Sequence, residues 1–490
     1  MPDAPPPPVH LDNVLSGLAE NPALPPTLVR RFFAYRKGFG NVAKRPDLTD
    51  DMIADIIAVN DHRLLHSLAL NHSLPHPFRM TLAVHPDPAI RAAVVIGAHD
   101  APRELFERLL GDADPQVRQH LAESDHVPAD LRARLATDPV PKVRASLAQW
   151  WTQAPEPTRR LLLTDLDDTV RAGACTTYYP RLPHPVPPTD LLPALLADPV
   201  TRAGAVRHRT LDADTARRLA WDPDEDVRTE LAKHPDLPAP LRDALAEDPS
   251  PLVALHIFGR QDTPESTRAA IHSRILSDVP PKDWLLDHQV LDDDALEGQL
   301  ISEMARLELR ALRLPWVTAD PLPYVDSPYA CFRASAAMSD RLPAPAVARL
   351  LDDEESIVRT TTAQHGRHRV DPVTAERIDR SYRPEKKTRW RPADDFPLPT
   401  HVLRRLATDP EPRMRQLAPR DPDLPVELVR RLAADPDPTV RGAIATHPQL
   451  PTHDLVQLLA DPSESVASAA AGNPNLPPAH MHRLLAQAGL

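Results

Sequence analysis

The sequence contains few of the residues that build disulfide-bonded or metal-bound proteins. Its 490 residues include only two cysteines, Cys175 and Cys331, whose positions match no metal-ligand spacing. This excludes a disulfide scaffold and a cysteine-ligated metal site, so we expect no cofactor. Two unpaired cysteines are typical of the reducing cytoplasm, where we expect the protein to be located.

Aromatic residues and long apolar runs are also scarce. Phe, Trp and Tyr together make up 4% of the chain, and apolar runs such as residues 92–98 are far shorter than the roughly 20 residues that cross a bilayer. The first four residues are Met-Pro-Asp-Ala, and four prolines follow, without the basic and apolar regions of a secretory signal. We therefore expect neither secretion nor a membrane partner.

Motifs for bond-making chemistry are missing from the sequence as well. It contains no glycine-rich phosphate loop, His-Glu-x-x-His, Gly-x-Ser-x-Gly or Cys-x-x-Cys. Histidines such as His234 and His447 stand at a turn position that is asparagine in other places, as at Asn473. His365 and His368 have a helical spacing but no third ligand nearby. We predict that the protein is not an enzyme and holds no metal.

Proline, in contrast, is abundant and recurs in register. Sixty prolines would be typical of a disordered chain, but here they mark a repeat. The phrase Asp-Pro-x-x-x-Val-Arg begins at Asp138, Asp222 and Asp435, and a second phrase, such as His-Pro-Asp-Leu-Pro at residues 234–238, lies between the copies. A fixed period of about 26 residues indicates a solenoid, in which each repeat contacts its neighbours.

Each repeat can be built from these two phrases. Asp222 is expected to cap a helix that begins at Pro223, because proline is tolerated in the first turn of a helix. Val227, Leu231 and Ala232 then fall on one face of this first helix. The second phrase breaks the helix, since the residue before a proline avoids the α region, and a second short helix follows. Neither helix is long enough to be stable alone, so stacking must supply the core.

We therefore predict an all-α solenoid of about seventeen two-helix repeats. Residues 1–10 are expected to be a disordered, proline-rich N-terminus, and residues 11–490 a single continuous solenoid. Within the solenoid, we expect regular repeats in residues 60–255 and 400–480, degenerate repeats in residues 256–352, and a lengthened repeat with a basic loop in residues 367–399.

The repeated sequence motif resembles the repeats of the leucine-rich repeat variant family. The resemblance rests on Asp-Pro, Val-Arg, Leu-Ala and His-Pro-Asp-Leu-Pro in this order, and it is clearest in residues 101–250 and 400–480. It implies an α-helix and a shorter 3₁₀-like helix stacked into a right-handed superhelix. HEAT repeats are similar to the same pattern. Some variant-repeat proteins carry an N-terminal iron–sulfur module, but residues 1–60 contain no cysteine, so we do not expect that cofactor.

Arginine recurs at two fixed distances from the first Asp of each phrase, here called the anchor Asp. One arginine lies six residues after the anchor and another four residues before it. Both fit a ladder that pairs Arg with an Asp of its own or the adjacent repeat. The alternative for the earlier arginine is a stripe that faces an acidic partner. The ladder residues we predict are Asp138, Arg144, Asp222, Arg228, Asp435 and Arg441, and the pre-anchor arginines are Arg108, Arg134, Arg218, Arg349, Arg405 and Arg431.

Residues 367–391 form a basic segment, with nine Lys or Arg against four acidic residues. A lengthened repeat often projects a loop from its binding face, so we expect this segment to contact an acidic partner. Two alternatives are a solvated loop and an internal clasp onto the acidic residues 278–303. The candidate partner-binding residues are Tyr382, Lys386, Lys387, Arg389, Trp390 and Arg391.

Three classes of function are compatible with these features. The first is a monomeric, non-enzymatic scaffold that binds a protein partner along an extended solenoid surface. The second is a nucleic-acid-binding protein, because HEAT-like DNA glycosylases resemble the Asp and Val-Arg pattern. A net charge of −12 and a pI near 6.0 argue against nucleic acid. The third, a HEAT-like lyase that attaches a chromophore to a protein, matches no residue pattern in this chain. We predict the scaffold.

Overall fold

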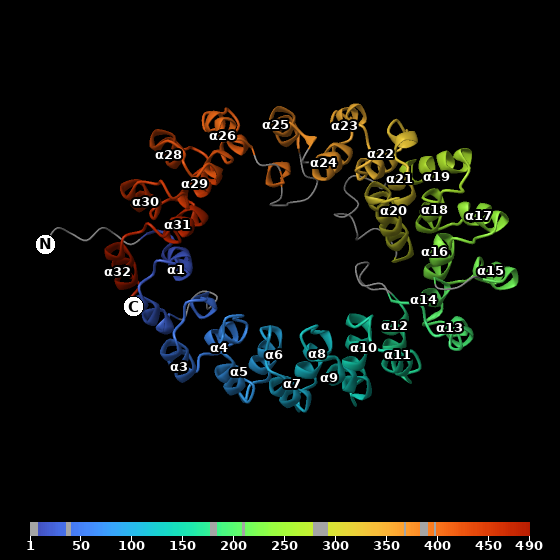
Figure 1. Cartoon of the computed structure of the whole chain (residues 1–490), viewed down its shortest axis with the longest axis horizontal. Coiled ribbons are helices and arrows are strands. Elements are labelled where there is room, and N and C mark those ends of the chain that lie inside the picture. The colour runs from blue at the N-terminus through green and yellow to red at the C-terminus, as the bar shows by residue number, and fades with distance from the viewer. Residues whose placement is uncertain are drawn as a thin grey trace. The chain divides into compact units, whose positions relative to one another are not determined.

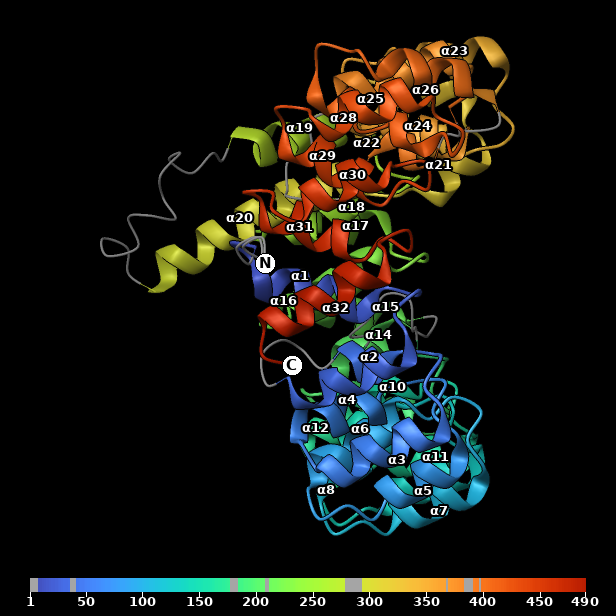
Figure 2. The same ribbon diagram turned by 90° about the vertical axis from the view of Figure 1, so that its left-hand side faces the viewer.

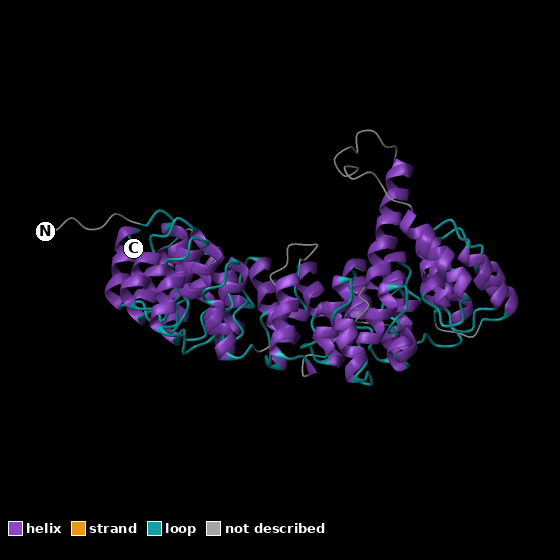
Figure 3. Cartoon of the chain, turned by 90° about the horizontal axis from the view of Figure 1, so that it is seen from above, coloured by secondary structure: helices purple, strands orange, loops and turns teal. Residues whose placement is uncertain are grey.

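The computed structural model describes residues 8–35, 41–176, 184–207, 211–277, 293–366, 369–382, 391–395 and 398–490. Across these residues every regular element is an α-helix or a short 3₁₀ helix (Figure 3). This confirms the predicted all-α solenoid class. The chain divides into two compact units: unit 1 contains residues 1–151 and 398–490, and unit 2 contains residues 152–397.

Unit 1 is built from two layers of helices (Figure 1). The first helix of each repeat packs on the first helix of the next repeat, as α6, α8 and α10 do. The first layer contains α1 (Leu11–Glu20), η2 (Asn41–Lys44), α4 (His62–Ala69), α6 (Pro88–Ile96), α8 (Pro115–Glu123), α10 (Pro141–Trp150), α27 (Pro412–Arg415) with η7 (Ala418–Arg420), α29 (Pro438–Ala445) and α31 (Glu464–Ala471). The second layer contains α2 (Pro26–Arg31) with η1 (Phe32–Ala34), α3 (Asp50–Val59), α5 (His76–Leu82), α7 (Arg103–Leu110), α9 (Ala129–Ala133) with η3 (Arg134–Thr137), α26 (Thr400–Leu406), α28 (Val426–Ala433), α30 (Thr452–Leu458) and α32 (Pro478–Gln487).

Unit 2 repeats the same arrangement. Consecutive first helices again pack directly on one another, as α14, α16 and α18 do. These helices are α12 (Asp168–Cys175), α14 (Arg202–Val206), α16 (Glu225–Lys233), α18 (Pro251–Phe258), α20 (Asp293–Ala311), α22 (Ala330–Ala337), α24 (Ser356–His365) and η6 (Pro392–Asp394). The others are α11 (Glu156–Leu163), α13 (Leu192–Ala197), α15 (Ala213–Leu219), α17 (Ala239–Ala246), α19 (Glu265–Ser277), α21 (Pro315–Ala319), η4 (Leu322–Tyr324), α23 (Ala344–Leu351) and α25 (Pro372–Ser381).

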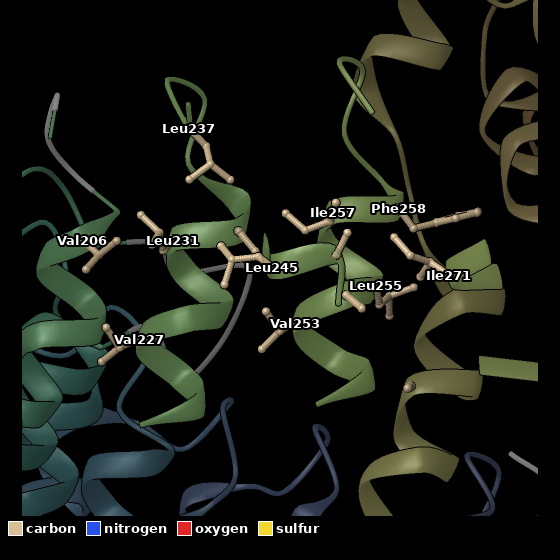
Figure 4. Packing of buried hydrophobic residues seen from close by; sticks show 14 of the residues in the cluster. Val206, Val227, Leu231, Leu237, Leu245, Val253, Leu255, Ile257, Phe258 and Ile271 are labelled. Carbon is tan, nitrogen blue, oxygen red and sulfur yellow. The ribbon is translucent and has the colours of Figure 1, made fainter. Parts of the chain in front are cut away.

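The core consists of the apolar faces that the repeat predicts. Val227, Leu231 and Ala232 on α16 are each at most 1% exposed, and Leu245 and Ala246 on α17 are each 2% exposed. Figure 4 shows such side chains from α14, α16, α17, α18 and α19 meeting between the helices of unit 2. Each helix is short, so the buried contacts between repeats supply most of its stability.

The first helices begin later than the sequence suggested. The predicted start of α16 at Pro223 is wrong, because the helix begins at Glu225 and its N-cap is Asp224. The Asp224 carboxylate accepts a hydrogen bond from the Asp226 amide at 2.9 Å, while Asp222 accepts one from the Asp224 amide at 3.1 Å. In this repeat, Asp222 therefore closes a turn in front of the helix, and Asp224 caps it.

The degenerate repeats contain a cluster of aromatic side chains in place of the regular sequence motif. Trp316 packs against Tyr324 and Phe332, with ring centroids 5.2 and 5.6 Å apart. Phe258 lies 5.1 Å from Tyr329 and 5.5 Å from Phe332. These rings hold α18, α21 and α22 together within unit 2, although Phe258 lies far from the other rings in the sequence.

The two ends of the described chain pack together in unit 1. Helix α1 lies against α31 and α32, and α2 also contacts α32 (Figure 2). The first repeat is thus the stacking neighbour of the last repeat.

Candidate binding surfaces

The arginine after each anchor links its own repeat to the next one. Arg228 donates to the backbone carbonyl of Asp222 at 2.8 Å and to the two carboxylate oxygens of Asp248 at 2.8 and 3.2 Å. Arg441 does the same with the carbonyl of Asp435 and the carboxylate of Asp461. The ion pairs therefore join adjacent repeats, and they bury both partners almost completely.

The other predicted ladder residues follow the same geometry. The carboxylate of Asp138 accepts from Arg118, that of Asp222 from Arg202 and that of Asp435 from Arg415, at 2.6 to 2.7 Å. Arg144 donates to the carbonyl of Asp138 at 2.6 Å. These charged side chains are bound to partners inside the fold, so they have little hydrogen-bonding capacity left for a ligand.

A second ladder runs through the turn position that the sequence fills with asparagine or histidine. The Asn71 amide donates to the carbonyls of Ala43 and Arg45 at 3.0 and 2.9 Å, in the preceding repeat. Asn473 makes the same pair of bonds to Ala445 and His447. This buried position is structural, in agreement with its interpretation as a turn residue.

The pre-anchor arginines differ from one another in whether they form an ion pair. Arg349 pairs with Asp326 at 3.1 Å, and both side chains are largely exposed. The side chains of Arg108, Arg134, Arg218 and Arg431 form no ion pair or hydrogen bond with the residues that the structure describes. These four guanidinium groups can therefore meet an anion from outside the chain.

Only part of the basic segment can be placed. Lys386, Lys387, Arg389 and Trp390 lie outside the described residues, so their role in partner binding stays a prediction. Arg391 is 9% exposed, and its Nε donates to the Asp379 carboxylate at 3.0 Å. It is a structural ion pair that holds η6 on α25 and not an exposed cation. The clasp onto residues 278–303 falls mainly on residues that the structure does not describe.

Tyr382, the remaining candidate, lines a pocket of about 730 Å³ in unit 2. The wall of this pocket is apolar at Leu276 and Leu307 and charged at Arg313 and Glu354. Burial lowers the pKa of the Arg313 guanidinium. The pocket borders the aromatic cluster through His272, whose ring centroid lies 4.9 Å from that of Tyr329.

The most conspicuous exposed side chain is Trp221, which follows α15. It is 73% exposed and lines a groove of about 630 Å³ whose other walls include Leu196, Leu211 and Arg218. Trp221 directly precedes the anchor Asp222, a position that is small or polar in most other repeats and is valine at Val84, in front of the turn residue His85. The corresponding residues are Gly111, Thr137, Thr164, Glu247, Thr408, Ala434 and Ala460.

The groove combines an apolar surface with one available cation. Asp212 is occupied as the N-cap of α15, where it accepts from the Thr215 amide and hydroxyl at 2.8 and 2.9 Å. Asp222 is occupied by Arg202, so no acidic group at the groove pairs with Arg218. The neighbouring Arg217, in contrast, binds Asp214 at 2.7 Å. A tryptophan face beside a guanidinium suits a ligand with an apolar group next to a carboxylate.

No three His, Cys, Asp or Glu side chains in the described part of the chain are grouped so that they could hold a metal ion. No helix in that part has the length and apolarity needed to cross a membrane.

Comparison with known proteins identifies no family for the chain. No protein family model matches it, and no curated protein does. One solved structure, the crystal structure of an engineered protein from the Northeast Structural Genomics Consortium, aligns with 93% of this chain and 98% of its own length. The identity is 14% and the TM-score is 0.12, so nothing about function follows from this alignment.

Proposed function

We propose that this protein is a non-enzymatic cytoplasmic scaffold, of the leucine-rich repeat variant or HEAT-like kind, that binds a protein partner. The observation that carries the proposal is the groove beside Trp221. Exposed tryptophan and arginine are the residues most enriched among the energetic centres of protein interfaces. In this chain they occur together at one groove, and most other repeats have a small or polar residue at the position of Trp221.

The chemistry of the groove indicates what the partner presents. Trp221, Leu196 and Leu211 offer an apolar surface, and Arg218 offers a planar set of donors that has no acceptor among the described residues. The partner segment therefore carries a proline, aliphatic or aromatic side chain next to a carboxylate. Nucleic acid is the less favoured ligand, because the chain has a net charge of −12.

Affinity capture with matched variants tests this function. The full-length chain and its Trp221→Ala, Arg218→Ala and Arg217→Ala variants are immobilised in equal amounts, and the proteins retained from native extract are quantified by mass spectrometry. A true partner loses about 30-fold in affinity with Trp221→Ala, the effect of removing a hot-spot side chain worth about 2 kcal/mol. Arg218→Ala also weakens binding, and that difference shrinks at high salt.

Arg217→Ala is the matched control, because Arg217 is bound to Asp214 and does not line the groove. It should retain the partner at the wild-type level. The proposal fails when Trp221→Ala and Arg218→Ala retain the same proteins, in the same amounts, as the wild type. Retention of DNA or RNA in place of a protein would favour the nucleic-acid alternative.

A further inference from the structure

The first and last repeats meet through the same bonds that join repeats within the chain. The Asn21 amide donates to the carbonyls of Ala471 and Asn473 at 2.8 and 2.7 Å. Asn71 and Asn473 make the corresponding pair of bonds to the repeats that precede them in sequence. Residues 8–35 thus occupy the position of the repeat that would follow residue 473, although no peptide bond joins them.

The apolar contact at this junction is as complete as one inside the solenoid. Val14, Leu15 and Leu18 of α1 are fully buried, and so are Ala467 and Ala470 of α31. The helices approach so closely that a Cβ added to Gly17 would lie 2.0 Å from the Ser468 carbonyl oxygen. A terminal repeat of a solenoid normally has a polar outer face, but here both terminal repeats present apolar faces to each other.

Polar contacts around this core fix the register of the two ends. His10 Nε2 lies 2.8 Å from the carbonyl oxygen of Pro462, and the Asn13 amide donates to Glu464 at 3.3 Å. On the second layer, Arg31 contacts His482 and the carbonyl oxygen of Leu490. The interface therefore has a specific geometry in both layers of helices.

We propose that this junction is exchangeable, and that the last repeat of one copy can bind the first repeat of a second copy. The two faces are complementary but different, so the contact between copies is head to tail. Only non-covalent contacts hold the chain's own ends together, and each end can make the same contacts with another molecule. Tethering gives the chain's own end a high effective concentration, so exchange increases as the protein concentration rises. This inference is independent of the Trp221 groove.

Chemical crosslinking of single-cysteine variants tests the exchange. Full-length Asn13→Cys and Glu464→Cys proteins are mixed at high concentration and treated with a short bis-maleimide. The native Cys175 and Cys331 are buried, and burial raises the pKa of each thiol to about 12, so neither competes for the reagent. We expect a covalent dimer that contains one copy of each variant and that becomes less abundant when the mixture is diluted before crosslinking.

Two controls make the outcome decisive. A mixture of Asn13→Cys with Glu104→Cys, an exposed glutamate on α7, has the same charge change and should give no dimer above background. The double variant Asn13→Cys/Glu464→Cys should crosslink within one chain. The proposal is overturned when the first mixture gives no more dimer than the Glu104→Cys control. It is equally overturned when the double variant does not crosslink, because α1 then does not rest on α31.

Discussion

Asp222 and Asp224 are two residues apart and have different roles. Asp224 caps α16 and lies at the surface, whereas the Asp222 side chain is buried and balances the charge of Arg202 at 2.7 Å. Loss of a cap removes one hydrogen bond to a backbone amide. Loss of a buried carboxylate also leaves a cation without its partner, which is the more costly change.

The two substitutions should therefore differ in cost. We expect Asp224→Ala to lower the free energy of unfolding by about 1 kcal/mol. We expect Asp222→Ala to lower it by roughly 2–3 kcal/mol, because Arg202 keeps its carbonyl contacts to Leu196 and Ala197 but loses the carboxylate. Urea denaturation followed by circular dichroism measures both. An equal loss in the two variants would contradict the role given to Asp222.

At the scale of elements, α1 and α31 approach each other closely at Gly17. Gly17→Ala forces these helices apart, since the added Cβ meets a backbone carbonyl that cannot rotate away. Overpacking of this kind costs about 1–3 kcal/mol. Hydrogen exchange should become faster in α1 and in α31 together, although the substitution lies in only one of them.

Gly442→Ala provides the control within the same unit. A Cβ at Gly442 would lie 3.8 Å from Val466, an ordinary contact, and alanine favours the helix by up to about 1 kcal/mol. This variant should leave exchange in α1 unchanged. If Gly17→Ala behaves like Gly442→Ala, the close approach of α1 to α31 is refuted.

The sequence predicted those features of the helices that depend on nearby residues. The repeat period predicted the two-helix repeat, and the spacing of the apolar residues predicted the buried face of Val227 and Leu231. Both patterns are formed by residues that are close in sequence. The start of α16 was placed two residues early, since Asp-Pro is equally compatible with a cap and with a turn. The aromatic cluster around Phe332 and the docking of α1 on α31 could not be predicted, because their residues are brought together only by folding.

The candidate site was less predictable than the fold. The sequence pointed to residues 367–391 by their charge and by the extra length of the repeat, and neither feature distinguishes an exposed cation from one paired inside, as Arg391 is. Trp221 can be recognised from the sequence. Alignment of the repeats by their anchors shows a tryptophan where most others have small or polar residues.

For the whole molecule, the buried anchor carboxylates make the free energy of unfolding depend on pH in the acidic range. Burial alone would raise the pKa of Asp435, but hydrogen bonds from Arg415 and the Asp437 amide outweigh it and lower the pKa. The pKa values of Asp112, Asp198 and Asp461 are lowered for the same reasons. A half-buried histidine acts in the same direction. Loss of solvent and the nearby Lys233 outweigh the opposing effect of Glu230 and lower the pKa of His256 to about 4.

Two pH windows of destabilisation follow. His256 titrates at 6.5 when unperturbed, so the unfolded chain binds its proton first, and stability falls between pH 6.5 and about 4. The anchor carboxylates contribute their full stabilisation above their pKa in the unfolded chain, which is about 3.9. This stabilisation is lost as the pH falls further, through their pKa values in the folded chain. Thermal unfolding measured from pH 8 to 3 should show both losses.

His256→Gln separates the two windows. Glutamine is neutral at every pH, so the variant should lose the decline between pH 6.5 and 4 and keep the one below it. An unchanged profile above pH 4 would show that His256 is not the group responsible. A chain whose stability stays constant from pH 4 to 3 would contradict the lowered pKa of the anchors.

The spacing of the ion-pair ladder has a consequence for how such a gene can change. Arg118, Arg228 and Arg441 each bind an Asp that lies twenty residues further along the chain, in the next repeat. Because these repeats have nearly the same sequence, unequal recombination that inserts or removes one whole repeat gives each of these arginines a new carboxylate at the same distance along the chain. The length of this protein can therefore vary in steps of one repeat over evolutionary time, without an unpaired charge at the point of exchange.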